Sequence, residues 1–455
     1  MTEMYNRMAE LCAEIVRSCP DEAVFMRYGC LSDERRDKIL QDLSQRVPAL
    51  VGRTLQKNDL NDSFYAAWDA CTAALRNRED RFAMIALAQT ADKAMQTLLL
   101  EKIRSCQNDD FSVVLNTNRE STGIGLLPRC SCLWERKHRL SHSYHRLDNF
   151  LYHFLLIENR ILGEWIDKHI FLPDPFFPGF SERKELVIGA TPLRGEKHFE
   201  EIGYTEQDIR FFTVQCEPET EKQDNEEIWQ KIQKASKQHC NILVFPEVLG
   251  NPATPEFIRQ KLLSLSPEEQ QQMPSLIVLP SVWENHMNTV TVLDRSGNLI
   301  CRQSKQTPFC LTLGGKKHLE GIHTNQVVTI LHYEGIGRIA ILICKDFLNT
   351  RYMEQLMRCF KLTLMIVPSY STGSYDFRQS FDVCAHDDCN VIWINTCAAV
   401  EEGKEANFRH IGYVRKRIGR NDDDSQKLCE MPSCEGFSKG ICRRDCLFFE
   451  TIKGV

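Results

Sequence analysis

Residues 241–247 read Asn-Ile-Leu-Val-Phe-Pro-Glu, an apolar, strand-like run that ends in the carboxylate of Glu247. Residues 339–347 read Ile-Ala-Ile-Leu-Ile-Cys-Lys-Asp-Phe, in which a second such run ends at the thiol of Cys344. Between them, residues 288–305 begin with Asn-Thr-Val-Thr-Val-Leu-Asp and end at the ammonium group of Lys305. A carboxylate, a cation and a thiol at or near strand ends can act as base, oxyanion donor and nucleophile. The three segments therefore predict chemistry that breaks a carbon–nitrogen bond through a thioester.

In this order, the segments resemble the carbon–nitrogen hydrolase family, which is the nitrilase and amidase superfamily. The family's glutamate follows a strand ending in Phe-Pro-Glu, its lysine follows a strand like 288–300, and its cysteine precedes an acidic residue. The separations of 305 − 247 = 58 and 344 − 305 = 39 residues suit the family. The later segments 364–369 (Leu-Met-Ile-Val-Pro-Ser) and 391–395 (Val-Ile-Trp-Ile-Asn) resemble its next two strands. Five motifs in the right order make the resemblance specific, and it covers roughly residues 185–420.

The resemblance implies a fold and a role for each reactive side chain. The fold is α/β, with a C-terminal four-layer α-β-β-α sandwich. Cys344 is implied as the nucleophile at a tight strand-to-helix turn, and Glu247 as the general base. Lys305 would stabilise the oxyanion together with the backbone N–H of Lys345.

Further residues are candidates for support of the site. Lys316 and Lys317 are rivals by residue type, but Lys305 alone has the right position after the 288–300 segment. Glu320 matches the family's second glutamate, which orients the lysine or water, although a plain surface glutamate would read the same. Polar residues at strand ends that could line a pocket are Ser369, Tyr370 and Asn395.

Two features depart from the family pattern. Lys345 stands where the family usually has an aromatic or small residue, and a cation facing the site would lower the pKa of the thiol or attract an acidic substrate. The loop 306–320 carries glycine and cysteine, unlike the family's usual stretch. Both departures bear on the substrate class more than on the chemistry.

Composition excludes several classes of protein. The chain has 455 residues, so two domains are expected, and 42% hydrophobic with 26% charged residues is typical of a soluble globular protein. A net charge of −6 gives no global basic signature for nucleic acid. No apolar run approaches the ~20 residues that span a bilayer, and the N-terminus lacks a signal-peptide pattern. We therefore expect a cytoplasmic protein with no membrane association, outside the family's membrane-bound acyltransferase branch.

Twenty cysteines are many, and in a chain without a signal they indicate buried, reduced thiols, one reactive thiol or a metal site. Four thiolates suffice for zinc, and the C-terminal tail offers Cys429, Cys434, Cys442 and Cys446. Their spacings of 5, 8 and 4 residues (434 − 429, 442 − 434 and 446 − 442) lack the close pairs of zinc knuckles. Free thiols or a redox pair are the favoured interpretation, and no metal or organic cofactor is expected.

Residues 1–175 are predicted to form an all-helical domain of unknown role. The segment 64–75 is rich in helix formers, and 81–104 has apolar residues at helical spacing. Ser141 could cap a further helix that runs to about Ile170. The Pro- and Gly-bearing stretch at 172–179 then separates this domain from a hydrolase domain at 185–455, which includes the cysteine-rich tail.

The predicted function is hydrolysis of a non-peptide C–N bond, in a linear amide or a nitrile, through a Cys344 thioester. An alternative from another class is a degenerate hydrolase domain that binds or senses a ligand. A third hypothesis places the chain within a larger system, such as a bacterial defence assembly. The helical region would then bind a protein partner, and the resemblance implies a homo-oligomer.

Overall fold

The structure is a computed structural model that describes residues 1–106, 113–136, 145–193, 198–206, 209–215, 219–399, 410–417, 428–432 and 446–454. Its helices up to residue 183 are α1 (Thr2–Ser18), α2 (Glu22–Gly29), α3 (Asp33–Arg46), η1 (Lys57–Asp59), α4 (Asp62–Asn77), α5 (Arg81–Ala94), α6 (Gln96–Cys106), α7 (Arg119–Thr122), η3 (Leu147–Phe150), α8 (Asn159–Leu162) and α9 (Phe180–Arg183). The later helices are α10 (Glu221–Ser236), α11 (Thr254–Leu263), α12 (Pro267–Gln272), α13 (Lys345–Leu348), α14 (Thr350–Phe360), α15 (Tyr375–His386) and η4 (Cys397–Ala399).

The strands form two large sheets and two small ones. The first large sheet has the order β11 (Leu299–Ser304), β10 (Met287–Asp294), β8 (Leu276–Val278), β7 (Ile242–Val244), β4 (Glu185–Ala190) and β20 (Phe448–Lys453), with β9 (Val282–Glu284) paired to β10. The second has the order β19 (Leu428–Pro432), β18 (His410–Arg415), β17 (Asn390–Ile394), β16 (Leu364–Pro368), β15 (Gly337–Ile341), β14 (Val327–Tyr333) and β3 (Ile166–Phe171). The small sheets are β12 (Cys310–Leu313), β13 (Lys316–Glu320), β6 (Ile209–Gln215) and β5 (His198–Glu206), and the pair β1 (Ile124–Pro128) and β2 (Phe154–Glu158).

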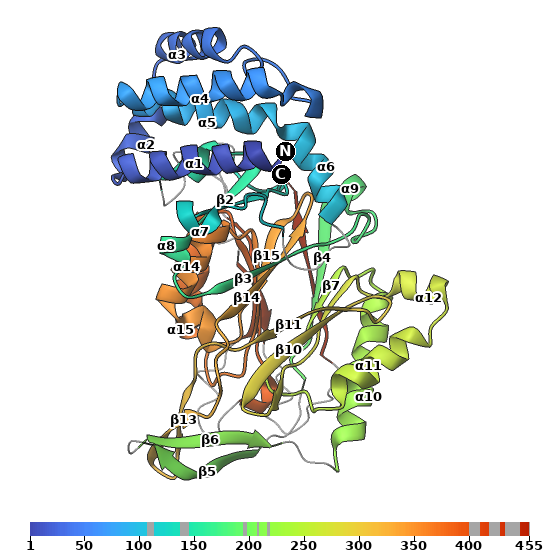
Figure 1. The fold of residues 1–455 in the computed structure, drawn as a ribbon. Coiled ribbons are helices and arrows are strands. Elements are labelled where there is room, and N and C mark those ends of the chain that lie inside the picture. The colour runs from blue at the N-terminus through green and yellow to red at the C-terminus, as the bar shows by residue number, and fades with distance from the viewer. Residues whose placement is uncertain are drawn as a thin grey trace.

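The two large sheets share one hydrophobic core. Ile242 and Val244 of β7 belong to the same buried cluster as Ile339 and Ile341 of β15. Helices α10 and α11 pack on the outer side of the first sheet, where Ile232 of α10 lies in a separate cluster with Leu243 of β7. Helices α14 and α15 lie on the outer side of the second sheet (Figure 1). The predicted α/β class is confirmed, because strands that are buried on both faces need helices over them.

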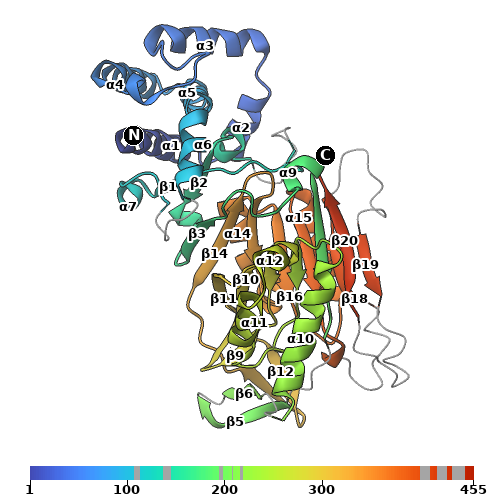
Figure 2. The same cartoon turned by 90° about the vertical axis from the view of Figure 1, so that its right-hand side faces the viewer.

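The N-terminal helices stand at one end of the two sheets, and the small sheet with β5 and β6 lies at the opposite end (Figure 2). The helical predictions for 64–75 and 81–104 are confirmed by α4, α5 and α6, with a break at Met95. None of the helices that the structure describes combines the length and the apolar character needed to cross a bilayer.

The prediction that residues 1–175 are all helical is wrong for 124–128, 154–158 and 166–171, which form the strands β1, β2 and β3. The segment expected as a helix up to Ile170 contains β2 and β3 instead, and Ser141 lies outside the described residues. All residues of β2 are buried, so its sequence shows neither the alternation of a half-buried strand nor the spacing of an amphipathic helix. From its pattern, such an apolar run is compatible with either a helix or a strand. Strand β3 is held by parallel pairing to β14, a partner more than 150 residues away (327 − 166 = 161). The division into domains at 1–175 and 185–455 stays a prediction.

Parallel pairing decides where the reactive residues lie. Strand β7 is parallel to β4 and β8, and β15 is parallel to β16, which is parallel to β17. Parallel neighbours present their carboxyl ends at the same edge of a sheet, where ligands bind in open α/β folds. Glu247, Cys344, Ser369 and Asn395 each follow the carboxyl end of one of these strands.

Candidate active site

Glu247 lies in the interior, three residues beyond β7, with 2% of its surface exposed. Its Oε1 accepts hydrogen bonds from the Nζ of Lys305 and from the Nδ2 of Asn288, each at 2.8 Å. Its Oε2 accepts the backbone N–H of Tyr370 at 2.9 Å. The carboxylate is thus held in one orientation by three donors.

Lys305 is also buried, and its ammonium group lies between two carboxylates. Its Nζ donates to Glu247 Oε1 at 2.8 Å and to Glu320 Oε2 at 2.7 Å. The predicted rivals, Lys316 and Lys317, are exposed on β13. The hairpin of β10 and β11 explains the difference, since it pairs Lys305 with Asn288 through a backbone bond of 2.8 Å and so directs it inward.

Glu320 ends β13, the strand that the small sheet contributes to the site. Its Oε2 also accepts the backbone N–H of Phe309 at 3.0 Å, and its Oε1 accepts from Asn288 Nδ2 at 3.3 Å. Glu320 is therefore a buried partner of Lys305 and not a surface glutamate.

Cys344 occupies the turn between β15 and α13 with φ 47° and ψ −99°. Its N–H donates to Pro368 O at 2.9 Å, and its Sγ lies 3.8 Å from Tyr370 O. Since Tyr370 also donates its N–H to Glu247, the backbone of one residue contacts both the thiol and the carboxylate. The N–H of Lys345 lies in the first turn of α13, where amides have no partner within the helix.

The electrostatics of the cluster follow from burial and from an excess of negative charge. Burial raises the pKa of Cys344, and the charge of Glu247 raises it further while Lys305 opposes the shift. Burial also raises the pKa of Glu247; Lys305 opposes this rise, and the negative charge of Glu320 adds to it. Burial alone would lower the pKa of Lys305, but Glu247 and Glu320 hold that pKa well above its usual range. A thiol that stays protonated at neutral pH needs a base, and a carboxylate with a raised pKa beside it is suited to that role.

The positive φ of Cys344 has an expected effect on stability. A side chain at positive φ is strained by about 1–3 kcal/mol, and glycine relieves that strain. We therefore expect Cys344→Gly to have a higher free energy of unfolding than Cys344→Ala, by about 1 kcal/mol. Urea unfolding of the two variants measures the difference. An ordinary turn would give the reverse order, with alanine the more stable, and that result would contradict the strained geometry.

The remaining predicted site residues have different positions. Tyr370 contacts the cluster through its backbone, while its hydroxyl donates to Ala398 O at 2.9 Å. Ser369 accepts from Trp393 Nε1 at 3.0 Å, and Asn395 is bonded to the backbone of Ser371 at 2.7 and 2.8 Å. The side chains of Asn395 and Ser369 therefore support the strand ends through Ser371 and Trp393.

Lys345 is half-buried, and the cation that lowers the pKa of Cys344 is Lys305. Two residues that were not predicted as site residues take part in the site. Asn288 bridges the two glutamates, and Asp346 accepts backbone N–H groups from the loop after Lys305. A bulge between Val292 and Leu293 shifts the register of the hairpin by one residue, so counting back from the turn at 294–298 would pair residue 288 with residue 304. The sequence alone therefore did not indicate that Asn288 lies beside Lys305.

The cysteine-rich tail is described only in part. Cys434 and Cys442 lie outside the described residues, Cys429 falls in β19, and Cys446 is half-buried. Within the described ranges, no three His, Cys, Asp or Glu side chains are grouped to hold a metal ion. The zinc hypothesis for the tail stays a prediction.

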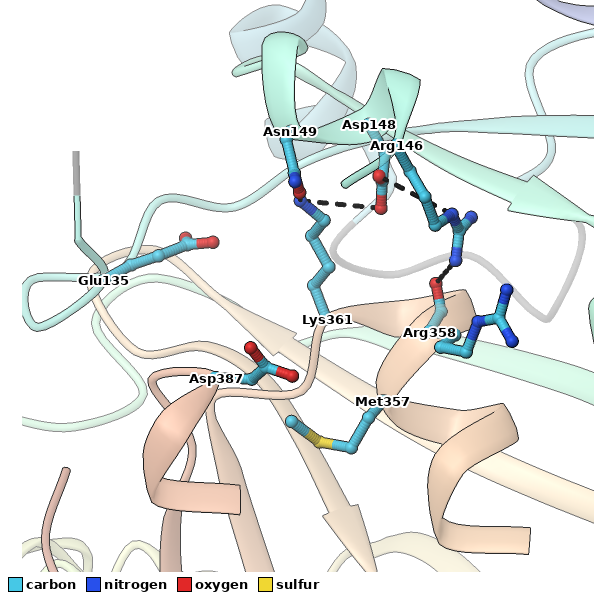
Figure 3. Close-up of a pocket in the computed structure, with 8 residues that line it drawn as sticks. All are labelled: Glu135, Arg146, Asp148, Asn149, Met357, Arg358, Lys361 and Asp387. Carbon is cyan, nitrogen blue, oxygen red and sulfur yellow. Dashed lines mark hydrogen bonds and ion pairs between the residues drawn. The ribbon is translucent and has the colours of Figure 1, made fainter. Parts of the chain in front are cut away.

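A polar cavity separate from the cluster lies between the N-terminal part and the end of α14 (Figure 3). Lys361 points from α14 toward Asp148 and Asn149 on η3, with Nζ 3.5 Å from the Asp148 carboxylate, and Arg146 donates to Arg358 O at 2.6 Å. The volume of about 20 Å³ is close to the ~10–15 Å³ that one water needs, which excludes a substrate. These polar contacts join the N-terminal part to α14.

The chain was compared with protein families, with curated proteins and with solved structures. No protein-family model and no curated protein matches its sequence. Similar solved structures include the NitFhit protein of C. elegans (14% identity, TM-score 0.37, 59% of this chain and 61% of that one) and a mutant amidase from Nesterenkonia sp. AN1 (13%, 0.39, 60% and 92%). Another is Nit3 of Saccharomyces cerevisiae, a member of branch 10 of the nitrilase superfamily (13%, 0.37, 59% and 90%). The chain thus spans less than two thirds of the NitFhit chain.

Proposed function

We propose that this chain is a carbon–nitrogen hydrolase that cleaves a non-peptide amide through a thioester on Cys344. The observation that carries the proposal is the shared contact of Glu247. One oxygen of its carboxylate accepts a hydrogen bond from Lys305, and the other accepts one from the N–H of Tyr370. The carbonyl of Tyr370 in turn contacts the thiol of Cys344. A base, a cation and a nucleophile thus adjoin one another in the interior.

The chemistry would proceed in two halves. Glu247 takes the thiol proton, and the sulfur attacks the carbonyl carbon of the amide. The ammonium group of Lys305 and the N–H of Lys345 stabilise the oxygen as it gains negative charge. As the C–N bond breaks, Glu247 gives its proton to the leaving amine. Glu247 then takes a proton from the water that attacks the thioester, and it returns this proton to the sulfur of Cys344 as the C–S bond breaks. The products are a carboxylic acid and ammonia or an amine.

The proposal extends to the architecture and to partners. The two large sheets with helices outside each would form the four-layer α-β-β-α sandwich of nitrilase-like proteins. A nitrile substrate would use the same nucleophile. Homo-oligomerisation, and a protein partner for the N-terminal helices, remain expectations of the same proposal.

Turnover of linear amides tests the proposal directly. We expect ammonia release from at least one member of a panel of aliphatic and aromatic primary amides. Intact-protein mass spectrometry should detect the acyl group on Cys344, and Cys344→Ala should show neither signal. Full turnover by Cys344→Ala on any amide that the protein hydrolyses would overturn the mechanism, and an exposed cysteine replaced in the same way, Cys310→Ala, serves as the control.

A further inference from the structure

The side chain of Asp346 connects the two loops that carry Lys305 and Cys344. It is 1% exposed and lies two residues after Cys344. Its carboxylate accepts the backbone N–H of Gln306 at 3.0 and 3.1 Å to its two oxygens and that of Thr307 at 2.7 Å. These are the two residues that follow Lys305. A buried carboxylate that accepts two backbone N–H groups fixes both partners, because each amide would otherwise lack an acceptor.

The same carboxylate also closes its own turn. Its Oδ2 lies 3.4 Å from the N–H of Ile343, and the N–H of Asp346 donates to Ile343 O at 3.0 Å. Cys344 lies within this turn at positive φ, a conformation that persists only where the surroundings determine it. A second hydrogen bond joins the same two loops, since Asn349 Nδ2 donates to Thr307 Oγ1 at 3.2 Å.

We propose that Asp346 is a positioning residue, whose ionised carboxylate sets the distance between the ammonium group of Lys305 and the thiol of Cys344. The inference rests on the proposed function, because it concerns the geometry of that same site. Asp346 acts through the backbone at Gln306 and Thr307 and does not itself touch the reacting atoms. Lys305 lowers the pKa of the thiol, so a displaced Lys305 would leave Cys344 less reactive.

Protonation of Asp346 would weaken the tie. A carboxylic acid keeps one acceptor oxygen but turns the other into a donor that faces a backbone N–H. Burial raises the pKa of Asp346 to about 7, with Lys305 and the backbone N–H groups opposing, and Tyr352 is the other titratable group that interacts with it. Since the pKa is raised, the proton binds as the pH falls through about 7, and the tie is present above that pH.

Alkylation of Cys344 by iodoacetamide tests the proposal without a known substrate. Its rate, followed by peptide mass spectrometry from pH 5 to 9, is expected to fall on the acid side more steeply than protonation of the thiol alone requires, with the extra step centred near pH 7. Asp346→Asn should lower the rate at pH 8 by about 10- to 100-fold and remove that acid step. The matched control is Asp294→Asn, because Asp294 accepts two backbone N–H groups, each at 2.8 Å, at the other end of the β10–β11 hairpin. This control should change neither the rate nor the profile.

A milder variant covers the case in which Asp346→Asn does not fold. Thr307→Val removes the hydroxyl that Asn349 contacts and keeps the backbone N–H, and it should lower the rate about 3-fold. If Asp346→Asn leaves the alkylation rate and its pH dependence unchanged, Asp346 has no positioning role. If Asp346→Asn does not fold, an unchanged alkylation rate in Thr307→Val leads to the same conclusion. If Glu247→Gln still slows alkylation in that case, the hydrolase proposal stands. If neither Asp346→Asn nor Glu247→Gln slows the alkylation of Cys344, both proposals are overturned.

Discussion

Glu247→Gln is expected to lower amide turnover by about 10²- to 10⁴-fold. Glutamine has the same shape as glutamate, and its amide oxygen can still accept from Lys305. It has no proton-accepting carboxylate, so the thiol of Cys344 keeps its proton at neutral pH, as burial and the raised pKa dictate. Both halves of the reaction lose their base, because the same carboxylate would activate the thiol and later the water.

The measurement is the initial rate of ammonia release under saturating amide, for wild type and variant. Glu284→Gln is a suitable control, since Glu284 is an exposed glutamate at the end of β9. Turnover by Glu247→Gln within a few-fold of wild type would remove Glu247 as the base.

The same variant separates an enzyme from a binding module. A ligand sensor built on this fold would bind an amide equally well as wild type and as Glu247→Gln, and neither protein would release ammonia. Calorimetric titration with the same amide distinguishes the two cases, because an enzyme loses turnover while a sensor has none to lose.

Lys305→Met is expected to abolish turnover and to lower the free energy of unfolding by about 3–5 kcal/mol. Methionine has a similar length and no charge, so the packing volume is nearly kept. Glu247 and Glu320 are left as two buried carboxylates without the ammonium group that lies 2.8 and 2.7 Å from them. Removing one partner from a buried charge cluster leaves an uncompensated charge, and this charge accounts for the large loss in the free energy of unfolding.

The loss of stability should depend on pH in a defined direction. Without Lys305, burial and the charge of Glu320 raise the pKa of Glu247 further above the unfolded value of about 4.3. The folded variant then binds more protons than the unfolded chain, so its stability rises as the pH falls. Urea unfolding at pH 8 and at pH 5 should therefore show a smaller deficit relative to wild type at pH 5.

Lys316→Met is the matched control, because Lys316 is exposed on β13 near the same loop. It should change the free energy of unfolding by no more than about 0.5 kcal/mol. Equal effects of Lys305→Met and Lys316→Met on stability and turnover would contradict the placement of Lys305 at the centre of the cluster.

The sequence allowed the central part of the site to be predicted but not its support. Glu247 and Cys344 each follow an apolar run, and such a run predicts a buried strand with a polar residue at its end. Asn288 and Asp346 gave no comparable signal, since their roles depend on a hairpin register and on a turn that meets a distant loop. Lys345 is adjacent to Cys344 in the sequence, yet the cation that affects the pKa of the thiol is Lys305.

Local sequence by itself determined the helices at 62–106, the β-strand character of the runs before Glu247 and Cys344, and the reactive side chains that follow them. Period and composition act over a few residues, so they fix such elements without reference to the rest of the chain. Only the tertiary structure decided that the apolar run at 154–157 is a strand and that β3 joins the sheet of Cys344. It also decided that Lys305 is the lysine buried between two carboxylates, with Glu320 brought in from another sheet. These outcomes depend on pairing and burial between residues far apart in sequence. The contacts that a distant partner supplies stabilise the observed structure by more than the local preference for an alternative structure.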